Sequence, residues 1–164
     1  MIDLYFDRIH REHQEAEALM IGYSQDELNQ LERLYNINIS GDFRIYMLRA
    51  GRSDGGVIGD DPLIIYRSSW SVRTHIARQM KFIQDLRNIE AHEFINQPFL
   101  FSIESESHYF FLQTGVPGDT DVYHYDEDSD VVVSSGFNIY GYLNNIVNIC
   151  GYGSVNCIGE MLRP

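Results

Sequence analysis

The sequence has few cysteines and no long apolar run. Only two of its 164 residues are cysteine, Cys150 and Cys157, which is too few for a disulfide framework. The N-terminal segment from residue 1 to residue 20 carries a charge every few positions, so we expect neither a signal peptide nor a membrane span there. These shortages predict a reduced, cytoplasmic protein that does not bind membranes.

Positive charge is also scarce. The chain has 12 Lys and Arg against 24 Asp and Glu, a formal net charge of −12, which argues against sequence-independent binding of nucleic acid. The acidity is uneven, because residues 98–164 hold nine acidic residues and one cation, whereas residues 62–97 have a small positive balance. This asymmetry favours a negative surface that attracts a basic partner, and acidity kept for solubility is the open alternative.

Motifs for metal binding are incomplete. His92-Glu93 lacks the second histidine that a zinc-binding helix needs. Residues 126–130 begin like a calcium-binding loop, but Val131 occupies the position of the required glycine and Phe137 that of the bidentate glutamate. We therefore expect no metal site.

Motifs for catalysis and for nucleotide binding are incomplete as well. The glycines between 55 and 59 lack a G-K-[ST] ending, and the aspartates around them would repel phosphate, so we expect no cofactor. No nucleophile, base and orienting group can be recognised from spacing. The one catalytic hypothesis is a small hydrolase whose site would combine Asp54, Asp60, His124 and Asp126.

Apolar residues at helical spacing predict helices over the first fifty residues. One stripe predicts a helix from about residue 2 to residue 20: Ile2, Phe6, Ile9, Ala16 and Met20. Ser24 and Glu27 form an S-x-x-E capping box that begins a second helix. A third, short helix has its apolar face at Phe43, Met47 and Ala50, and the glycine-rich segment 51–61 after it is expected to be a loop.

The rest of the chain is predicted to hold one long helix, a sheet and a closing helix. A short strand is expected at 63–66. Steps of three and four then predict a helix from residues 69–71 to 89, with an apolar face at Val72, Ile76, Met80, Ile83, Leu86 and Ile89. After Pro98 the period falls to two, which predicts strands at 99–103, 109–113, 122–125 and 131–133, joined as an antiparallel meander. Asn138 should cap a closing helix whose apolar face includes Cys150, so we expect a buried thiol there.

This order of elements predicts an α+β protein. It comprises N-terminal helices, one long central helix, an antiparallel four- to five-stranded meander sheet and a C-terminal helix. The length and the hydrophobic fraction of 44% fit a single domain covering residues 1–164.

Three segments resemble a known superfamily: SQDELNQLERLYN, FRIYMLRAGRSDGGVIGDD and YHYDEDSDVVVSSGFNIYGYLNNIV. From Ser24 to Cys150 the chain is similar to the SUKH superfamily, which groups bacterial toxin-immunity proteins with fungal cell-wall assembly regulators. The resemblance divides the chain into an N-terminal helix at 1–22, a SUKH-like core at 24–150 and a C-terminal tail at 151–164. The chain differs from the family pattern at Ile39-Ser40-Gly41, where members of the family commonly have a Leu-Pro pair.

The resemblance implies a binding protein that is not an enzyme and that blocks a toxin encoded beside it. Many such toxins are nucleases, which tend to be basic, so the implied partner is a cognate basic protein toxin. A SUKH-type regulatory or scaffold protein with an endogenous partner is the second hypothesis, and the small hydrolase is the third. Repulsion between acidic copies predicts a monomer or a weak homodimer.

We predict that acidic connectors and nearby aromatic residues line the partner interface. Charges would speed docking and aromatic anchors would slow release. The predicted residues are Asp54, Asp60, Asp61, Trp70, Asp119, Asp121, Tyr123, Tyr125, Asp126, Glu127, Asp128 and Asp130. The alternative is that the acidic hairpin tips are only solvated, with the interface elsewhere on the sheet or the helices.

Overall fold

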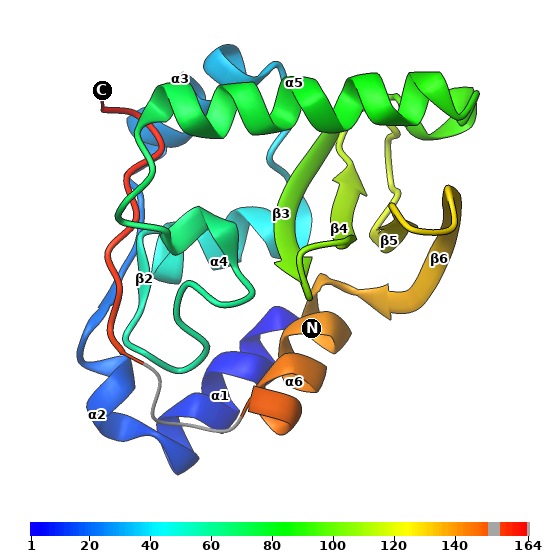
Figure 1. Ribbon diagram of the computed structural model, residues 1–164. Coiled ribbons are helices and arrows are strands. Elements are labelled where there is room, and N and C mark those ends of the chain that lie inside the picture. The colour runs from blue at the N-terminus through cyan, green and yellow to red at the C-terminus, as the bar shows by residue number, and fades with distance from the viewer. Residues whose placement is uncertain (151–154, 164) are drawn as a thin grey trace.

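The structure, a computed structural model, describes residues 1–150 and 155–163. Within these ranges the protein has an α+β fold of six α-helices, two short 3-10 helices and two antiparallel sheets, as the sequence predicts. The larger sheet lies between α5 (Val72–Asn88) on one face and helices that include α1 (Ile2–Glu12) and α6 (Ile139–Cys150) on the other (Figure 1). No helix in the described residues is long and apolar enough to cross a membrane.

The N-terminal helix is shorter than predicted. It breaks at His13, whose backbone has φ −143° and ψ 51°, so α1 is followed by a separate short helix, α2 (Gln14–Glu17). Met20 lies in a two-residue strand, β1 (Met20–Ile21), and not in the helix. The buried residues of α1 end at Ile9, and the polar residues from 10 to 15 include no apolar side chain that would hold a longer helix against the core.

The second and third predicted helices are confirmed. The Ser24 capping box begins α3 (Gln25–Tyr35): the Ser24 hydroxyl accepts from the Glu27 amide, and the Glu27 carboxylate accepts from the Ser24 amide at 2.9 Å. Helix α4 (Gly41–Ala50) buries Phe43, Met47 and Ala50. The 51–61 loop contains β2 (Ser53–Asp54), which pairs with β1.

The expected strand at 63–66 is wrong. Residues Ile64–Tyr66 form a 3-10 helix, η1, and Leu63 makes one isolated bridge to Ser102. All four residues from 63 to 66 are buried, and a continuous apolar run does not distinguish a short strand from a buried helical turn.

The long central helix is confirmed, but its buried face differs from the predicted one. The helix begins where the spacing predicts, and the Ser71 hydroxyl caps it by accepting from the Thr74 amide. The buried side chains are His75, Gln79, Phe82 and Leu86, whereas Met80 is 66% exposed. A second short 3-10 helix, η2 (His92–Phe94), follows.

Gln79 and His75 explain this rotation of the buried face. The Gln79 side-chain amide donates to the Leu100 carbonyl at 2.6 Å and accepts from the Leu100 amide at 2.9 Å, so a polar residue closes the edge of the sheet. His75 packs edge-on against Trp70, with ring centroids 5.1 Å apart. Two core positions of the helix are thus polar, which a hydrophobicity pattern cannot find.

His75 should make the protein sensitive to mild acid. Its two ring nitrogens are buried and have no hydrogen-bond partner in the described residues, and burial together with the positive charge of Arg67 lowers its pKa to about 4. Between pH 6.5 and 4 the unfolded chain therefore binds a proton that the native state does not. Stability should fall as the pH decreases through this window, by about 2 to 3 kcal/mol from this residue.

Urea unfolding of the wild type and of His75→Leu at pH 7 and pH 4.5 measures this effect. The variant should lose less stability than the wild type over this range. Exposed His92 supplies the control, because His92→Leu should follow the wild-type curve. Equal losses in the wild type and in His75→Leu would contradict the assignment.

The predicted meander sheet is confirmed with four strands. They are β3 (Pro98–Glu104), β4 (His108–Gln113), β5 (Asp121–Asp126) and β6 (Val131–Asn138), antiparallel and in chain order. The predicted cap of α6 is also confirmed, since the Asn138 side chain accepts from the Gly141 amide at 2.8 Å. Cys150, however, is exposed, so its predicted place in the core is wrong.

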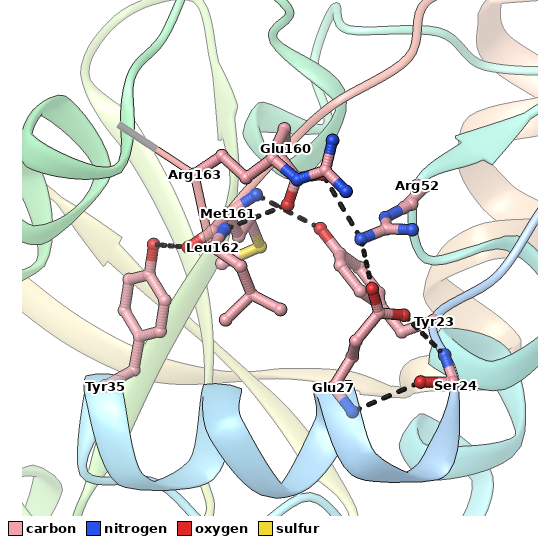
Figure 2. Close-up of polar contacts among 9 residues, drawn as sticks. All are labelled: Tyr23, Ser24, Glu27, Tyr35, Arg52, Glu160, Met161, Leu162 and Arg163. Atoms are coloured by element: carbon pink, nitrogen blue, oxygen red, sulfur yellow. Dashed lines mark hydrogen bonds and ion pairs between the residues drawn. The ribbon is translucent and has the colours of Figure 1, made fainter.

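The described C-terminal residues 155–163 do not behave as a tail beyond the core. They run beside β2 and end near α3 (Figure 1), and Met161 is only 1% exposed. The Tyr35 hydroxyl donates to the Met161 carbonyl at 2.8 Å, and the Met161 amide donates to the Tyr23 hydroxyl at 3.2 Å (Figure 2). We call residues 155–163 the C-terminal strap.

Candidate partner-binding surface

The predicted acidic residues of the sheet fall into two groups at opposite ends of β5. Asp119 and Asp121 precede or begin the strand, and residues 126–130 form its far end and the turn into β6. A strand of this length separates the groups by roughly 17 Å. In the register of the sheet, Asp121 pairs with Asn138 and Asp126 pairs with Val131. The two acidic groups therefore lie at the two ends of β6.

Hydrogen bonds in the turn between β5 and β6 lower the pKa of two of its carboxyl groups, those of Asp126 and Glu127. Asp126 accepts hydrogen bonds from the Ser129 hydroxyl at 2.7 Å and from the Asp128 amide at 3.0 Å, and chiefly the first of these lowers its pKa. The Tyr109 hydroxyl donates to Glu127 at 2.6 Å and lowers the pKa of that carboxyl. Glu127 also lies 3.2 Å from the ammonium of Lys81, so part of its charge is compensated.

At the other end of β5, Asp119 organises the local backbone. It accepts from the Asp121 amide and from the Tyr123 hydroxyl, both at 2.9 Å. Asp121 is exposed. The carboxylate of Asp121 can therefore interact with a partner without disturbing these contacts.

The two predicted tyrosine anchors differ in accessibility. Tyr125 is 2% exposed and stacks in the cluster beneath α5, so its prediction as an interface anchor is wrong. Tyr123 is half-buried against Phe94, with ring centroids 5.3 Å apart, and keeps part of its ring at the surface. The alternation along β5 predicts that these two side chains share a face, and the packing of α5 over that face decides which one remains accessible.

Asp54 is structural, which corrects its prediction as a partner-binding residue. It is completely buried, and its carboxylate accepts from the amides of Gly56 at 2.9 Å, Ile58 at 2.8 Å and Gly59 at 3.0 Å. Burial raises its pKa, and these amide donors oppose that shift. The carboxylate holds the glycine-rich loop in shape and is not available to a partner.

Asp60, Asp61 and Trp70 lie apart from the two acidic groups of the sheet. Asp60 neighbours Cys157 of the C-terminal strap. Burial of the Cys157 thiol, and then the Asp60 carboxylate, raise the pKa of that thiol. Asp61 is exposed in the same loop. Trp70 is half-buried between two cations, with the guanidinium carbons of Arg67 and Arg78 at 4.9 and 5.7 Å from its ring centroid. None of the three extends the acidic surface around β6.

The four residues of the hydrolase hypothesis do not form one site. Asp54 is enclosed by its own loop, and Asp60 neighbours Cys157. His124 lies on the sheet, where its Nε2 is 2.9 Å from Nδ1 of His108 and its ring stacks on Phe110. Burial and the neighbouring His108 lower the pKa of His124. Within residues 1–150 and 155–163 no group of three His, Cys, Asp or Glu is placed to hold a metal ion.

The sequence predicts the strand between the two acidic groups, but sequence reasoning missed its role as an exposed, uncharged surface. Val131 and Val133 on β6 are each 47% exposed, Phe137 is also exposed, and the segment from Val131 to Asn138 has no charged residue. The signal was present as a run of apolar and small polar residues that follows an acidic turn. It was interpreted only as a strand, because exposure at a sheet edge depends on strand order.

A pocket beside α5 is a second exposed apolar feature. Its volume is about 440 Å³, and Leu34, Ile76, Met80, Ile83 and Ile95 are among the residues that line it. Three of these belong to the predicted core face of α5. Their exposure follows from the rotation of the helix toward His75 and Gln79.

Comparisons with protein-family models, with curated proteins and with solved structures found no match to this chain.

Proposed function

We propose that this protein is an acidic immunity protein that binds a basic protein toxin and neutralises it. The observation that supports this proposal best is the surface around β6. An uncharged strand with exposed valines lies between two groups of carboxylates. Such a surface combines an apolar contact area with charges that attract a basic protein.

The electrostatics favour rapid association. A net charge of −12 produces a long-range attraction for a basic partner, and the exposed Asp121, Asp128 and Asp130 concentrate this field at the two ends of β6. No ion pair joins these three residues to a cation in the described part of the chain. The SUKH resemblance supports the same function, because it implies a partner encoded beside the protein.

The neighbouring gene provides the direct test. The C-terminal domain encoded by a long adjacent reading frame is expressed in a host with and without this protein. The proposal requires growth arrest by the domain alone and growth when both are present. An adjacent domain that arrests growth equally in both cases would refute it and leave the regulatory or scaffold hypothesis.

Neutralising two exposed acids should slow association with that toxin domain. For Asp121→Asn combined with Asp128→Asn, we expect an association rate about fivefold lower at low ionic strength, because two steering charges are lost. The difference should shrink at physiological ionic strength, where the screening length falls to about 8 Å. Stopped-flow association at the two salt concentrations measures both effects.

The matched control removes the same charge elsewhere. Glu15 of α2 and Asp26 of α3 are exposed residues on the side of the molecule opposite β6 (Figure 1), so Glu15→Gln with Asp26→Asn changes the net charge equally. This variant should keep an association rate within about twofold of the wild type, since its charges are remote from β6. Equal slowing in both variants would show that only net charge matters and not the surface around β6.

A further inference from the structure

The two edge strands of the four-stranded sheet differ in whether other residues bond to their outward backbone groups. The β3 edge is covered: the Ile103 amide donates to the Pro62 carbonyl at 3.1 Å, and the Gln79 side chain satisfies both backbone groups of Leu100. Leu63 also forms a bridge to Ser102 on this edge. Strand β6 forms the other edge, at the right of Figure 1, and no strand of the described residues pairs with its outer side.

The register shows which backbone groups of β6 point outward. The Glu127 amide donates to the Ser107 carbonyl at 2.9 Å, which fixes the alternation of hydrogen-bonded pairs between β4 and β5. Carried across β5, this alternation directs the N–H and C=O groups of Val131 and Val133 toward β5. Those of Val132 and Ser134 therefore point away from the sheet.

The covered edge provides an internal check of this assignment. The same alternation, carried across β4 in the other direction, directs the backbone groups of Leu100 and Ile103 outward from β3. These are the two residues whose amides bond to Gln79 and Pro62. At β6, by contrast, no described residue bonds to the outward backbone groups of Val132 or Ser134.

The stretch from Val131 to Ser134 lacks most of the devices that protect an edge strand. It has no proline and no charged side chain, and both valines on its open face are half exposed. The pairing is interrupted only beyond Ser134, where the register shifts and Gly136 takes φ +77°. A four-residue stretch with two outward amides and two outward carbonyls therefore remains open to pairing.

Charge selects the occupant of this edge. In a two-fold antiparallel dimer through β6, the acidic turn at 126–130 of one copy would lie beside Asn138 and Asp121 of the other. Acidic groups would then meet at both ends of the contact, which opposes self-association. An extended segment with an uncharged middle and basic residues on both sides would instead have favourable contacts along its whole length.

We propose that β6 binds an extended, basic segment of a partner protein, which adds a fifth strand to the sheet through the backbone of Val132 and Ser134. This proposal rests on the proposed function and names the mode of binding. The paired backbones supply affinity, Val131 and Val133 contact alternate side chains of the segment, and the flanking carboxylates select basic residues.

The test uses a synthetic peptide of alternating valine and threonine with lysines at both ends. Fluorescence anisotropy measures its affinity for the wild type, for Ser134→Pro and for Ser134→Ala. Ser134 is exposed, and both substitutions remove the contact between its hydroxyl and the Gly136 amide. Only proline removes the outward N–H, and its ring blocks the edge without breaking a bond to β5.

We expect Ser134→Ala to bind within about twofold of the wild type and Ser134→Pro at least about tenfold more weakly. A second peptide, N-methylated at alternate residues, tests the same hydrogen bonds on the wild-type protein and so does not depend on the folding of a variant. It should bind as weakly as the proline variant does. A third peptide with glutamates in place of lysines should also bind at least about tenfold more weakly.

Equal affinity of the N-methylated and unmodified peptides, or of the basic and acidic peptides, would overturn the proposal. So would a dimer of the wild type that dissociates on Ser134→Pro substitution, because the occupant would then be a second copy. The toxin assay separates this inference from the proposed function. Full neutralisation by Ser134→Pro would refute edge pairing and leave the function intact, whereas peptide binding without any neutralisation would refute the function alone.

Discussion

Replacing Met161 with alanine should lower the free energy of unfolding by about 2 to 5 kcal/mol. Met161 is 1% exposed and belongs to the main core, although it lies three positions before the last residue of the sequence. We expect a value in the upper half of this range. Tyr23 and Tyr35 bond to the amide and the carbonyl of Met161, so the strap cannot easily move inward to fill the cavity (Figure 2).

The same strap supplies the control. Ile158 is 51% exposed, and Ile158→Ala should change stability by less than about 0.5 kcal/mol. A second variant tests the close approach of the strap, because a Cβ at Gly159 would lie 2.0 Å from the Ile65 carbonyl oxygen. Gly159→Ala should therefore be destabilising as well. Urea unfolding curves measure all three, and equal effects of Met161→Ala and Ile158→Ala would show that the strap does not contribute to the core.

An ion-pair network joins the strap to the helix that carries the capping box. The Arg52 guanidinium lies 2.7 Å from Glu27 and 3.2 Å from Glu160 (Figure 2). Glu27 also accepts from the Ser24 amide, and this hydrogen bond is the chief cause of its lowered pKa. One carboxylate thus serves both the start of α3 and the attachment of the strap.

The sequence predicts those elements that depend on local pattern. The Ser24 capping box, the Ser71 start of α5 and the Asn138 cap of α6 each involve residues within three positions of one another, so the sequence is sufficient to find them. The meander follows for the same reason, because short connectors join strands with a period of two.

Features set by distant residues were not predicted. The buried face of α5 depends on Gln79, which bonds to Leu100 of β3, and the burial of Met161 depends on Tyr23 and Tyr35. A hydrophobicity pattern assigns polar residues to the surface and leaves a C-terminal segment unplaced. It cannot represent contacts between residues that are far apart in the sequence, 21 positions for Gln79 and Leu100 and more than a hundred for Met161 and the two tyrosines.

The candidate binding surface also combines features that the local sequence predicts with features that depend on distant contacts. The acidic connectors at 119–121 and 126–130 were found from composition, and the structure places both at the surface. Their arrangement at the two ends of β6 follows from strand order and register. The acidic neighbours of Tyr125 predict a place at the surface, and only the packing of α5 shows that this side chain is buried.

The sequence of the glycine-rich loop does not distinguish the buried, structural carboxylate of Asp54 from the exposed carboxylate of Asp61. Replacing Asp54 with alanine should cost about 3 to 5 kcal/mol, because the buried amides of Gly56, Ile58 and Gly59 would lose their acceptor. Burial raises the pKa of Asp54, which means that the surroundings disfavour its charge and that hydrogen bonding is the stabilising contribution.

Asp54→Asn should therefore be less harmful than Asp54→Ala, at about 1 to 2 kcal/mol, since a neutral amide keeps one acceptor oxygen of the same size. Asp61→Asn removes an equal charge from an exposed position of the same loop and should leave stability within about 0.5 kcal/mol of the wild type. Thermal and urea unfolding of the three variants give the order. If Asp54→Ala proved no more harmful than Asp61→Asn, the carboxylate would not be holding the loop, and Asp54 would again be a candidate for contact with the partner.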